Sequence, residues 1–144
     1  MARVLVIDDE PDVLLLCRVN LERAGHEVLE APDGERGMAL ARSERPDMIV
    51  LDVMLPRTDG FEVLETLREL DETRNVPVVM LTAKAQHEDQ VRGWSAGASG
   101  YVTKPFSPAA LTETLARVYA MTQDERRQRR ADALAILEDR TFEA

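Results

Sequence analysis

The sequence has little cysteine and no long apolar run. Its 144 residues include one cysteine, Cys17, so no disulfide can form within the chain. Cys17 lies among apolar residues at helical spacing, and we expect a buried, unreactive thiol. No apolar run approaches the ~20 residues of a membrane-spanning helix. The first apolar run ends at Asp8 and Asp9, too early for a signal peptide. We therefore expect a cytoplasmic protein with no membrane partner.

Basic residues are fewer than acidic ones. The chain has 18 Lys and Arg against 27 Asp and Glu, a net charge of -9. Direct nucleic-acid binding needs a basic surface, so this balance disfavours it. The run of arginines at 126–130 is flanked by acids, and we interpret it as a solvated helix face. A hydrophobic fraction of 44% is enough for one ordinary core.

Short apolar runs indicate a sheet. They cover residues 4–7, 48–51, 78–81 and 101–102. The first three do not alternate with polar residues, which is typical of strands buried on both faces of a parallel sheet. A weaker strand is expected near residues 27–30.

Helical patterns separate these strands. Pro11 suits the first turn of a helix, and Gly25 suits the residue after its end. Further helices are expected over residues 33–43, 60–70 and 86–95, and from Ser107 onwards. Five alternating strand–helix units predict a doubly wound α/β domain with a five-stranded parallel sheet.

The C-terminal segment has a different pattern, so we place a domain boundary between residues 1–121 and a helical extension, 122–144. Thr122 and Glu125 have the spacing of a capping box, which predicts a helix over 123–139. Its apolar residues form one short patch: Ala133, Leu134, Ile136 and Leu137. Because a polar stretch precedes this patch, we expect it to dock on a second copy or on a partner protein.

Polar residues follow the apolar runs directly. They are Asp8 and Asp9, Asp52, Thr82 and Lys104. The carboxyl ends of parallel strands lie along one edge, where ligands bind if the strand order reverses. Any one of these residues could simply terminate a strand or cap a helix. Their joint placement at four strand ends favours a functional site.

Three carboxylates at one sheet edge require compensation. Two unit charges ~5 Å apart repel by about 3 kcal/mol at an effective dielectric of ~20. The cluster therefore predicts a divalent cation, and oxygen ligands in an open site favour Mg²⁺. A carboxylate beside the metal can attack phosphorus and form an aspartyl phosphate. Thr82 and Lys104 could then bind the phosphoryl oxygens.

Four motifs carry a family resemblance. VIDDEPD, LDVMLPRTDG, MLTA and GYVTKPF resemble the receiver domain of response regulators in two-component signalling, over about residues 3–121. The resemblance implies the flavodoxin-like strand order 2-1-3-4-5 of chemotaxis regulators. It also implies a phosphorylation-dependent signalling switch, which catalyses only its own phosphoryl transfer and slow autodephosphorylation. Its partners would be a sensor histidine kinase or phosphotransfer protein and a downstream protein effector.

The resemblance assigns the metal and phosphate ligands. Asp52 matches the phosphoacceptor. Asp9 and Asp52 would bind Mg²⁺ directly, together with the backbone carbonyl of Met54, while Asp8 would act through water.

The resemblance also assigns the switch residues. Thr82 and Tyr101 match the switch pair, Lys104 matches the residue that senses the phosphate, and the bond to Pro105 would be cis. Ser99 and Gly100 replace two acids that help many DNA-binding regulators to form a phosphorylation-driven dimer. A homodimer is therefore only a possibility.

Two other functions use similar residues. A phosphatase of the haloacid dehalogenase type also has an aspartate nucleophile, but it needs a second acid at the position of Met54. A flavin-binding flavodoxin would need a Ser/Thr/Gly-rich phosphate loop where this chain has Asp8, Asp9 and Glu10. Both alternatives are disfavoured.

Overall fold

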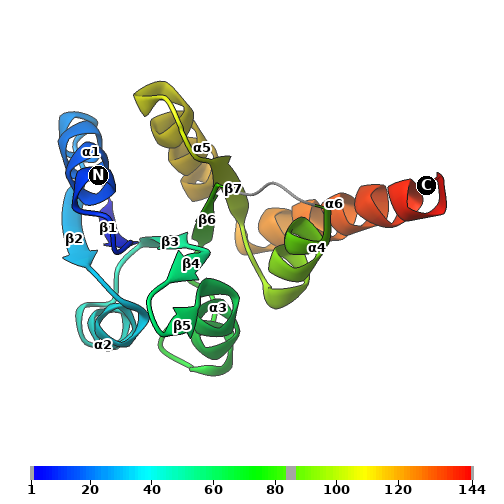
Figure 1. Cartoon of the computed structure of the whole chain (residues 1–144), viewed down its shortest axis with the longest axis horizontal. Coiled ribbons are helices and arrows are strands. Elements are labelled where there is room, and N and C mark those ends of the chain that lie inside the picture. The colour runs from blue at the N-terminus through cyan, green and yellow to red at the C-terminus, as the bar shows by residue number, and fades with distance from the viewer. Residues whose placement is uncertain (1, 84–86, 144) are drawn as a thin grey trace.

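The protein forms an α/β sandwich with one additional helix (Figure 1). The structure, a computed structural model, describes residues 2–83 and 87–143. Its main strands are β1 (Arg3–Ile7), β2 (Glu27–Ala31), β3 (Met48–Asp52), β6 (Val78–Thr82) and β7 (Gly100–Thr103). A short ribbon consists of β4 (Met54–Leu55) and β5 (Thr58–Asp59). The helices are α1 (Pro11–Arg23), α2 (Gly34–Glu44), α3 (Gly60–Glu69), α4 (His87–Ala96), α5 (Pro108–Ala120) and α6 (Gln123–Glu143).

The five main strands form one parallel sheet in the order β2-β1-β3-β6-β7. This is the predicted order 2-1-3-4-5, because β4 and β5 belong to the separate ribbon. Every residue of β3 and β6 is buried, as their continuous apolar runs predict. The order reverses between β1 and β3, so the carboxyl ends of these strands open onto a common crevice.

Helices cover both faces of the sheet. On one face, α1 and α5 pack against alternate side chains of the central strands, and buried Cys17 belongs to this layer as predicted. On the other face lie α2, α3 and α4, with Leu64 and Trp94 in the core. Figure 1 shows the two layers on opposite sides of the strands. In the described part of the chain, no helix combines the length and the apolar character needed to cross a membrane.

The β4–β5 ribbon is a feature that the hydrophobic pattern did not predict. Its two strands have two residues each, too few to show a periodicity. Arg57 in the connecting turn adopts the left-handed region with φ 65°. Asp59 then caps α3, its carboxylate accepting a hydrogen bond of 2.8 Å from the backbone nitrogen of Phe61. The ribbon therefore leads the chain from the end of β3 into α3.

Helix α6 begins with the predicted capping box. The backbone nitrogen of Thr122 donates to the Glu125 carboxylate at 3.0 Å, and the backbone nitrogen of Glu125 donates to the Thr122 hydroxyl at 3.1 Å. The helix then continues to Glu143, beyond the predicted end at residue 139.

The expectation that the apolar patch of α6 docks on a second copy or on a partner protein is wrong. Leu137 is only 5% exposed and joins the core on the α4 side, with Ala133 and Leu134 packed against it. Residues three and four apart share one helix face, which explains why these three face inward while Ile136 is exposed. The patch therefore docks mainly on its own domain.

The arginines that precede this patch are also not simply solvated. Arg126, Arg129 and Arg130 are half-buried. The Arg129 guanidinium lies 5.9 Å from the ring centroid of Trp94 on α4. Arg126 donates to backbone carbonyls near the end of α5. These long side chains hold α6 against the domain. The sequence did not indicate this role, because flanking acids are typical of a solvated helix face.

Candidate functional site

An acidic cluster occupies the crevice at the carboxyl end of β1 and β3. Single carboxylate oxygens of Asp8, Asp9, Glu10 and Asp52 all lie within 4.8 Å of one another. Asp8 is fully buried and Asp52 is 4% exposed, whereas Asp9 and Glu10 are exposed. The structure thus brings together the three predicted carboxylates and adds Glu10. Glu10 directly follows the two predicted acids, and that position could have indicated its place in the site.

Among the described residues, Lys104 is the cation that pairs with this acidic cluster. Its Nζ lies 2.9 Å from Asp8 Oδ2 and 3.3 Å from both Asp52 Oδ2 and Glu10 Oε1. Lys104 follows β7, and its bond to Pro105 is cis, as the resemblance implies. Strands on both sides of the central β3 therefore contribute to one cluster.

Burial and charge shift the protonation of these groups. Burial, and then the neighbouring charge of Asp8, raise the pKa of Asp52 from 3.8 to about 6. Burial also raises the pKa of Asp8, although Lys104 and the backbone nitrogen of Glu10 oppose the rise. Burial would lower the pKa of Lys104, but its interactions with Asp8 and Asp52 raise it above its usual value. Lys104 is therefore fully charged at neutral pH.

The donor set fits a hard divalent cation. Four carboxylates face one ammonium group, and all the candidate ligand atoms of the cluster are carboxylate oxygens. The backbone nitrogen of Met54 donates to Asp52 Oδ1 at 3.2 Å, which places the backbone of residue 54 beside the cluster. Oxygen ligands and excess negative charge are the properties of a Mg²⁺ site.

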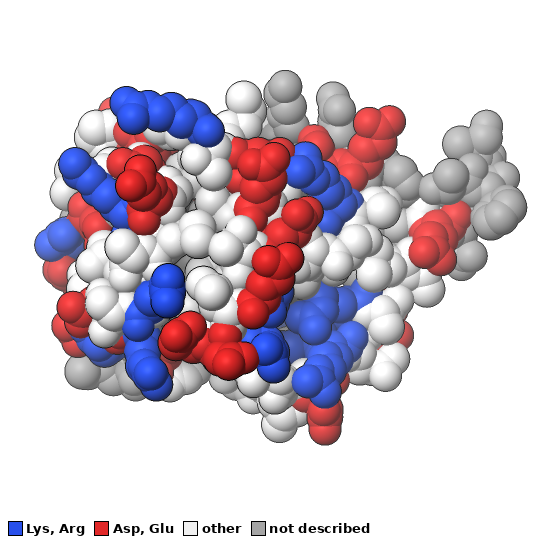
Figure 2. Space-filling view, turned by 90° about the horizontal axis from the view of Figure 1, so that it is seen from below, with Lys and Arg blue, Asp and Glu red and all other residues white. Residues whose placement is uncertain are grey.

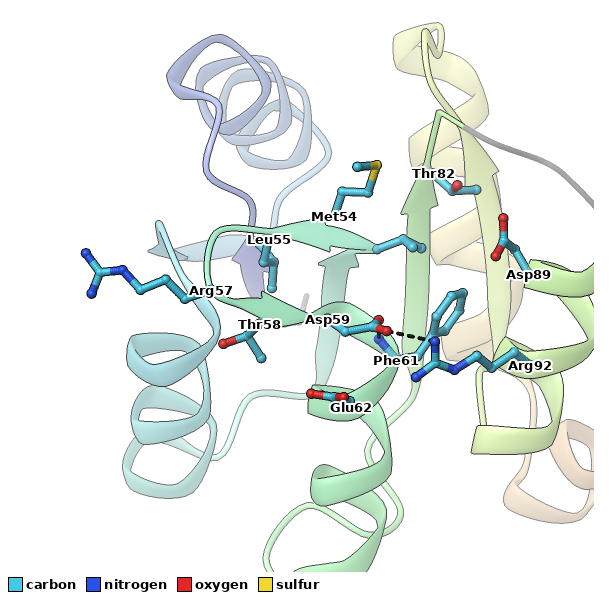
Figure 3. Close-up of a pocket in the computed structure, with 11 residues that line it drawn as sticks. Met54, Leu55, Arg57, Thr58, Asp59, Phe61, Glu62, Thr82, Asp89 and Arg92 are labelled. Atoms are coloured by element: carbon cyan, nitrogen blue, oxygen red, sulfur yellow. Dashed lines mark hydrogen bonds and ion pairs between the residues drawn. The ribbon is translucent and has the colours of Figure 1, made fainter.

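Thr82 lines a cavity of about 680 Å³ next to the acidic cluster. The cavity lies between the β4–β5 ribbon, the start of α3 and helix α4. Figure 3 shows Thr82 and Met54 at one end of it. Across the cavity, Arg92 of α4 forms a 2.7 Å ion pair with Asp59, and its guanidinium lies 4.9 Å from the ring centroid of Phe61. The hydrophobic pattern did not indicate this ion pair, because neither Arg92 nor Asp59 follows one of the apolar runs, and β5 is too short to show a periodicity.

Tyr101 lies on β7 and packs against α4. Its hydroxyl donates to the backbone carbonyl of Asp89 at 3.2 Å, and its ring centroid lies 5.5 Å from that of Trp94. A Cβ added to Gly93 would stand 1.4 Å from the hydroxyl oxygen, so the absence of a side chain there admits the ring. Burial, and then the charge of Asp89, raise the pKa of Tyr101 above its ordinary value. Thr82 and Tyr101 lie on adjacent paired strands.

A protein-family model matches most of the chain. Residues 4–116 match the response regulator receiver domain. The chain belongs to the response regulator receiver domain family. Members of this family are signalling modules of two-component systems that accept a phosphoryl group. The predicted resemblance to receiver domains and the predicted fold class are therefore confirmed.

Individual relatives agree. The chain is 48% identical over 121 residues to the DNA-binding dual master transcriptional regulator RpaA of Synechocystis. The aligned region covers 84% of this chain and 49% of RpaA. The chain thus spans about half the length of this curated relative.

Solved structures give the same result. The chemotaxis response regulator CheY4 of Vibrio cholerae superposes with a TM-score of 0.79 at 37% identity, covering 82% of this chain and 98% of CheY4. The receiver domain of sensor histidine kinase PA1611 from Pseudomonas aeruginosa, solved with a magnesium ion in its active site cleft, superposes with a TM-score of 0.77. That match has 30% identity and covers 83% of this chain and 98% of the other.

Proposed function

We propose that Asp52 accepts a phosphoryl group from a phosphohistidine of a sensor histidine kinase or phosphotransfer protein. The observation that carries this proposal is the buried Asp52 carboxylate at the end of the central strand, inside the acidic cluster and 3.3 Å from Lys104. In the transfer, an Asp52 oxygen forms a bond to phosphorus while the phosphorus–nitrogen bond to the donor histidine breaks. The electron pair of that bond stays with the departing imidazole.

The acidic cluster is the proposed Mg²⁺ site. Asp9, Asp52 and the backbone carbonyl of Met54 would hold the ion, with Asp8 acting through water. The ion would neutralise charge on the phosphoryl oxygens during transfer. Support comes from the oxygen-only donor set and from the magnesium ion in the PA1611 receiver domain.

Lys104 and Thr82 are the proposed phosphoryl ligands. Lys104 already lies within 3.3 Å of Asp52, so its ammonium group can pair with a phosphoryl oxygen when the acids bind the ion. Thr82 ends β6, and Asp52 pairs with Leu81, the residue before it, in the sheet register. Because this register places Thr82 one residue beyond the partner of Asp52, we expect its hydroxyl to reach a phosphoryl group on Asp52.

The proposed output is a change in the surface around α4. If Thr82 moves towards the phosphoryl group, the space beside it becomes available to Tyr101, the proposed switch partner. Tyr101 would leave its contacts with Asp89 and Trp94 and turn inward, a population shift between two states. We propose that residues 1–121 form the phosphorylated unit in the cytoplasm and that a protein effector reads this face.

Phosphorylation of Asp52 can be tested with a small phosphodonor. The protein is incubated with acetyl phosphate and Mg²⁺ and its intact mass is measured. The wild type should gain one phosphoryl adduct, and Asp52→Asn should gain none. Asp12→Asn makes the same chemical change on the exposed first turn of α1 and should behave as wild type. An adduct that persists in Asp52→Asn would refute the assignment.

A further inference from the structure

A second charged region lies at the carboxyl-terminal end of α4. A cavity of about 300 Å³ opens where the first turns of α6 meet the loops after α3 and α4. We call it the arginine cavity; its lining residues are Arg68, Arg74, Asn75, Ser95, Gly97, Ser99, Gln123, Arg126, Arg127 and Arg130. Among the residues that the structure describes, no acidic and no apolar side chain lines it. Figure 2 shows basic side chains gathered in the lower part of one face, right of centre.

Most of this positive charge lacks a nearby acid. Two exposed arginines have partners: Arg74 lies 2.6 Å from Asp71, and Arg127 lies 3.7 Å from Asp124. The other three, Arg68, Arg126 and Arg130, form no ion pair with any acid in the described ranges. Five arginines less two acidic partners leave three uncompensated charges in a chain whose net charge is -9.

Backbone carbonyls hold these three guanidinium groups in place. Arg68 donates to Gly97 O through Nε at 3.0 Å and Nη2 at 2.7 Å, and to Val76 O at 2.6 Å. Arg126 donates to carbonyls near the end of α5, and Arg130 approaches Gly97 O at 3.5 Å. Carbonyl dipoles orient the side chains but carry no net charge. Burial, and then the charges of Arg130 and Arg126, lower the pKa of Arg68 to about 10.

The lining defines the ligand chemistry. Guanidinium groups present paired donors that match phosphate oxygens, and Asn75, Gln123 and Ser95 add neutral polar groups. The described lining has no aromatic side chain on which a nucleobase could stack. A volume of about 300 Å³ is at the lower limit of ligand pockets. We propose that the arginine cavity binds a compact phosphate-bearing anion of the size of inorganic pyrophosphate.

Binding would connect α6 to the receiver core. Arg68 and Ser99 belong to the core, whereas Arg126, Arg127 and Arg130 belong to α6. An anion between them would neutralise the repulsion and hold the two parts together. Because the anion contacts the docked arrangement only, it should also raise the melting temperature.

Calorimetry can test this site directly. Sodium pyrophosphate is titrated into the full chain at low salt with EDTA, so that no metal can carry the anion to the acidic cluster. The wild type should bind, and the affinity should fall as NaCl is added. The double variant Arg126→Gln/Arg130→Gln should bind at least about tenfold more weakly. The exposed pair Arg23→Gln/Arg36→Gln makes the same charge change elsewhere and should retain wild-type affinity.

Two further variants separate this proposal from unfolding and from the phosphoacceptor. Arg127→Gln changes an exposed side chain, so it should fold, as circular dichroism would show, and bind more weakly. Asp52→Asn should bind as tightly as the wild type. Loss of binding in Asp52→Asn, equal loss in the control pair, or no binding by the wild type would overturn the proposal. Tight binding of ADP without binding of pyrophosphate would refute the assigned ligand class.

Discussion

The acidic cluster at the sheet edge and the arginine cavity beside α6 both hold an excess of one charge. In the acidic cluster, four carboxylates share Lys104, which lies within 3.3 Å of three of them. In the arginine cavity, three guanidinium groups are held by backbone carbonyls alone among the described residues. An ammonium group inside the acidic cluster is positioned to take part in chemistry, whereas carbonyls around the arginines can only orient them. The first arrangement suits a reaction and the second suits binding.

Lys104→Met should reveal this difference most strongly. The change removes the ammonium group but keeps most of the alkyl chain, so the rate of phosphorylation by acetyl phosphate should fall between about a hundredfold and a thousandfold, as for other transition-state donors. The affinity for Mg²⁺ should rise, because the acids lose a competing cation.

Arg130→Gln is the matched control for Lys104→Met. It removes one positive charge from the arginine cavity and should leave the phosphorylation rate within about twofold of wild type. Phosphorylation is followed by intact mass and Mg²⁺ affinity by calorimetry. Equal rate losses in both variants would show that net charge, and not the position of Lys104, controls the reaction.

The acidic cluster should also reduce stability in the absence of metal. The folded-state pKa of Asp52, about 6, lies above its ordinary value of 3.8, so the folded form binds the proton more tightly than the unfolded form does. Stability is therefore lost as pH rises from about 4 through about 6, by up to about 3 kcal/mol. With EDTA at pH 7.5, Asp52→Asn should melt at a higher temperature than the wild type, and Mg²⁺ should reverse that order.

Melting curves at pH 4.5 and pH 7.5 give the comparison for Asp52. The difference between the variant and the wild type should be larger at pH 7.5. Glu65→Gln alters an exposed acid on α3 and should show no such change. A wild type that is more stable than Asp52→Asn in EDTA at pH 7.5 would contradict the repulsion inferred for the cluster.

The two charged regions also differ in how far the sequence predicts them. Asp8 and Lys104 directly follow a strand and Asp52 is the last residue of one. Buried apolar runs reveal where strands end, so the meeting of these residues at one edge follows from the parallel topology. Glu10 was not predicted to belong to the acidic cluster, although it directly follows Asp8 and Asp9, which were. The sheet order came from the family resemblance and not from the hydrophobic pattern.

The arginine cavity could not be predicted in this way. Of its five arginines, Arg68 belongs to α3, Arg74 to a loop and the other three to α6. Their meeting therefore depends on how α6 docks. That docking rests on Leu137 and on the contact between Arg129 and Trp94, which are tertiary contacts with no local sequence signal. The acids around the arginine run instead suggested a solvated face. Helix formation at Thr122 was predictable because a capping box is local.

Gly93→Ala should show whether α4 connects the two regions. Tyr101, the proposed switch residue, places its hydroxyl where a side chain at residue 93 would stand, 1.4 Å from the added Cβ. Trp94, the next residue, contacts both Tyr101 and Arg129 of α6. The added methyl group should displace the Tyr101 ring and change the fluorescence of Trp94, the one tryptophan of the chain. Overpacking costs about 1–3 kcal/mol, and the helix preference of alanine offsets roughly 0.5–1 kcal/mol, so stability should fall by about 1 kcal/mol.

Tyr101→Phe is the control for Gly93→Ala, because it keeps the ring and removes only the hydroxyl that donates to Asp89 O. Its Trp94 fluorescence should stay close to that of the wild type. If α4 couples the regions, Gly93→Ala should also change the affinity of the arginine cavity for pyrophosphate, since Gly97 at the end of α4 accepts hydrogen bonds from Arg68 and Arg130. Altered fluorescence with unchanged pyrophosphate affinity would show that the displacement of Tyr101 stops at Trp94. The acidic cluster and the arginine cavity would then respond independently.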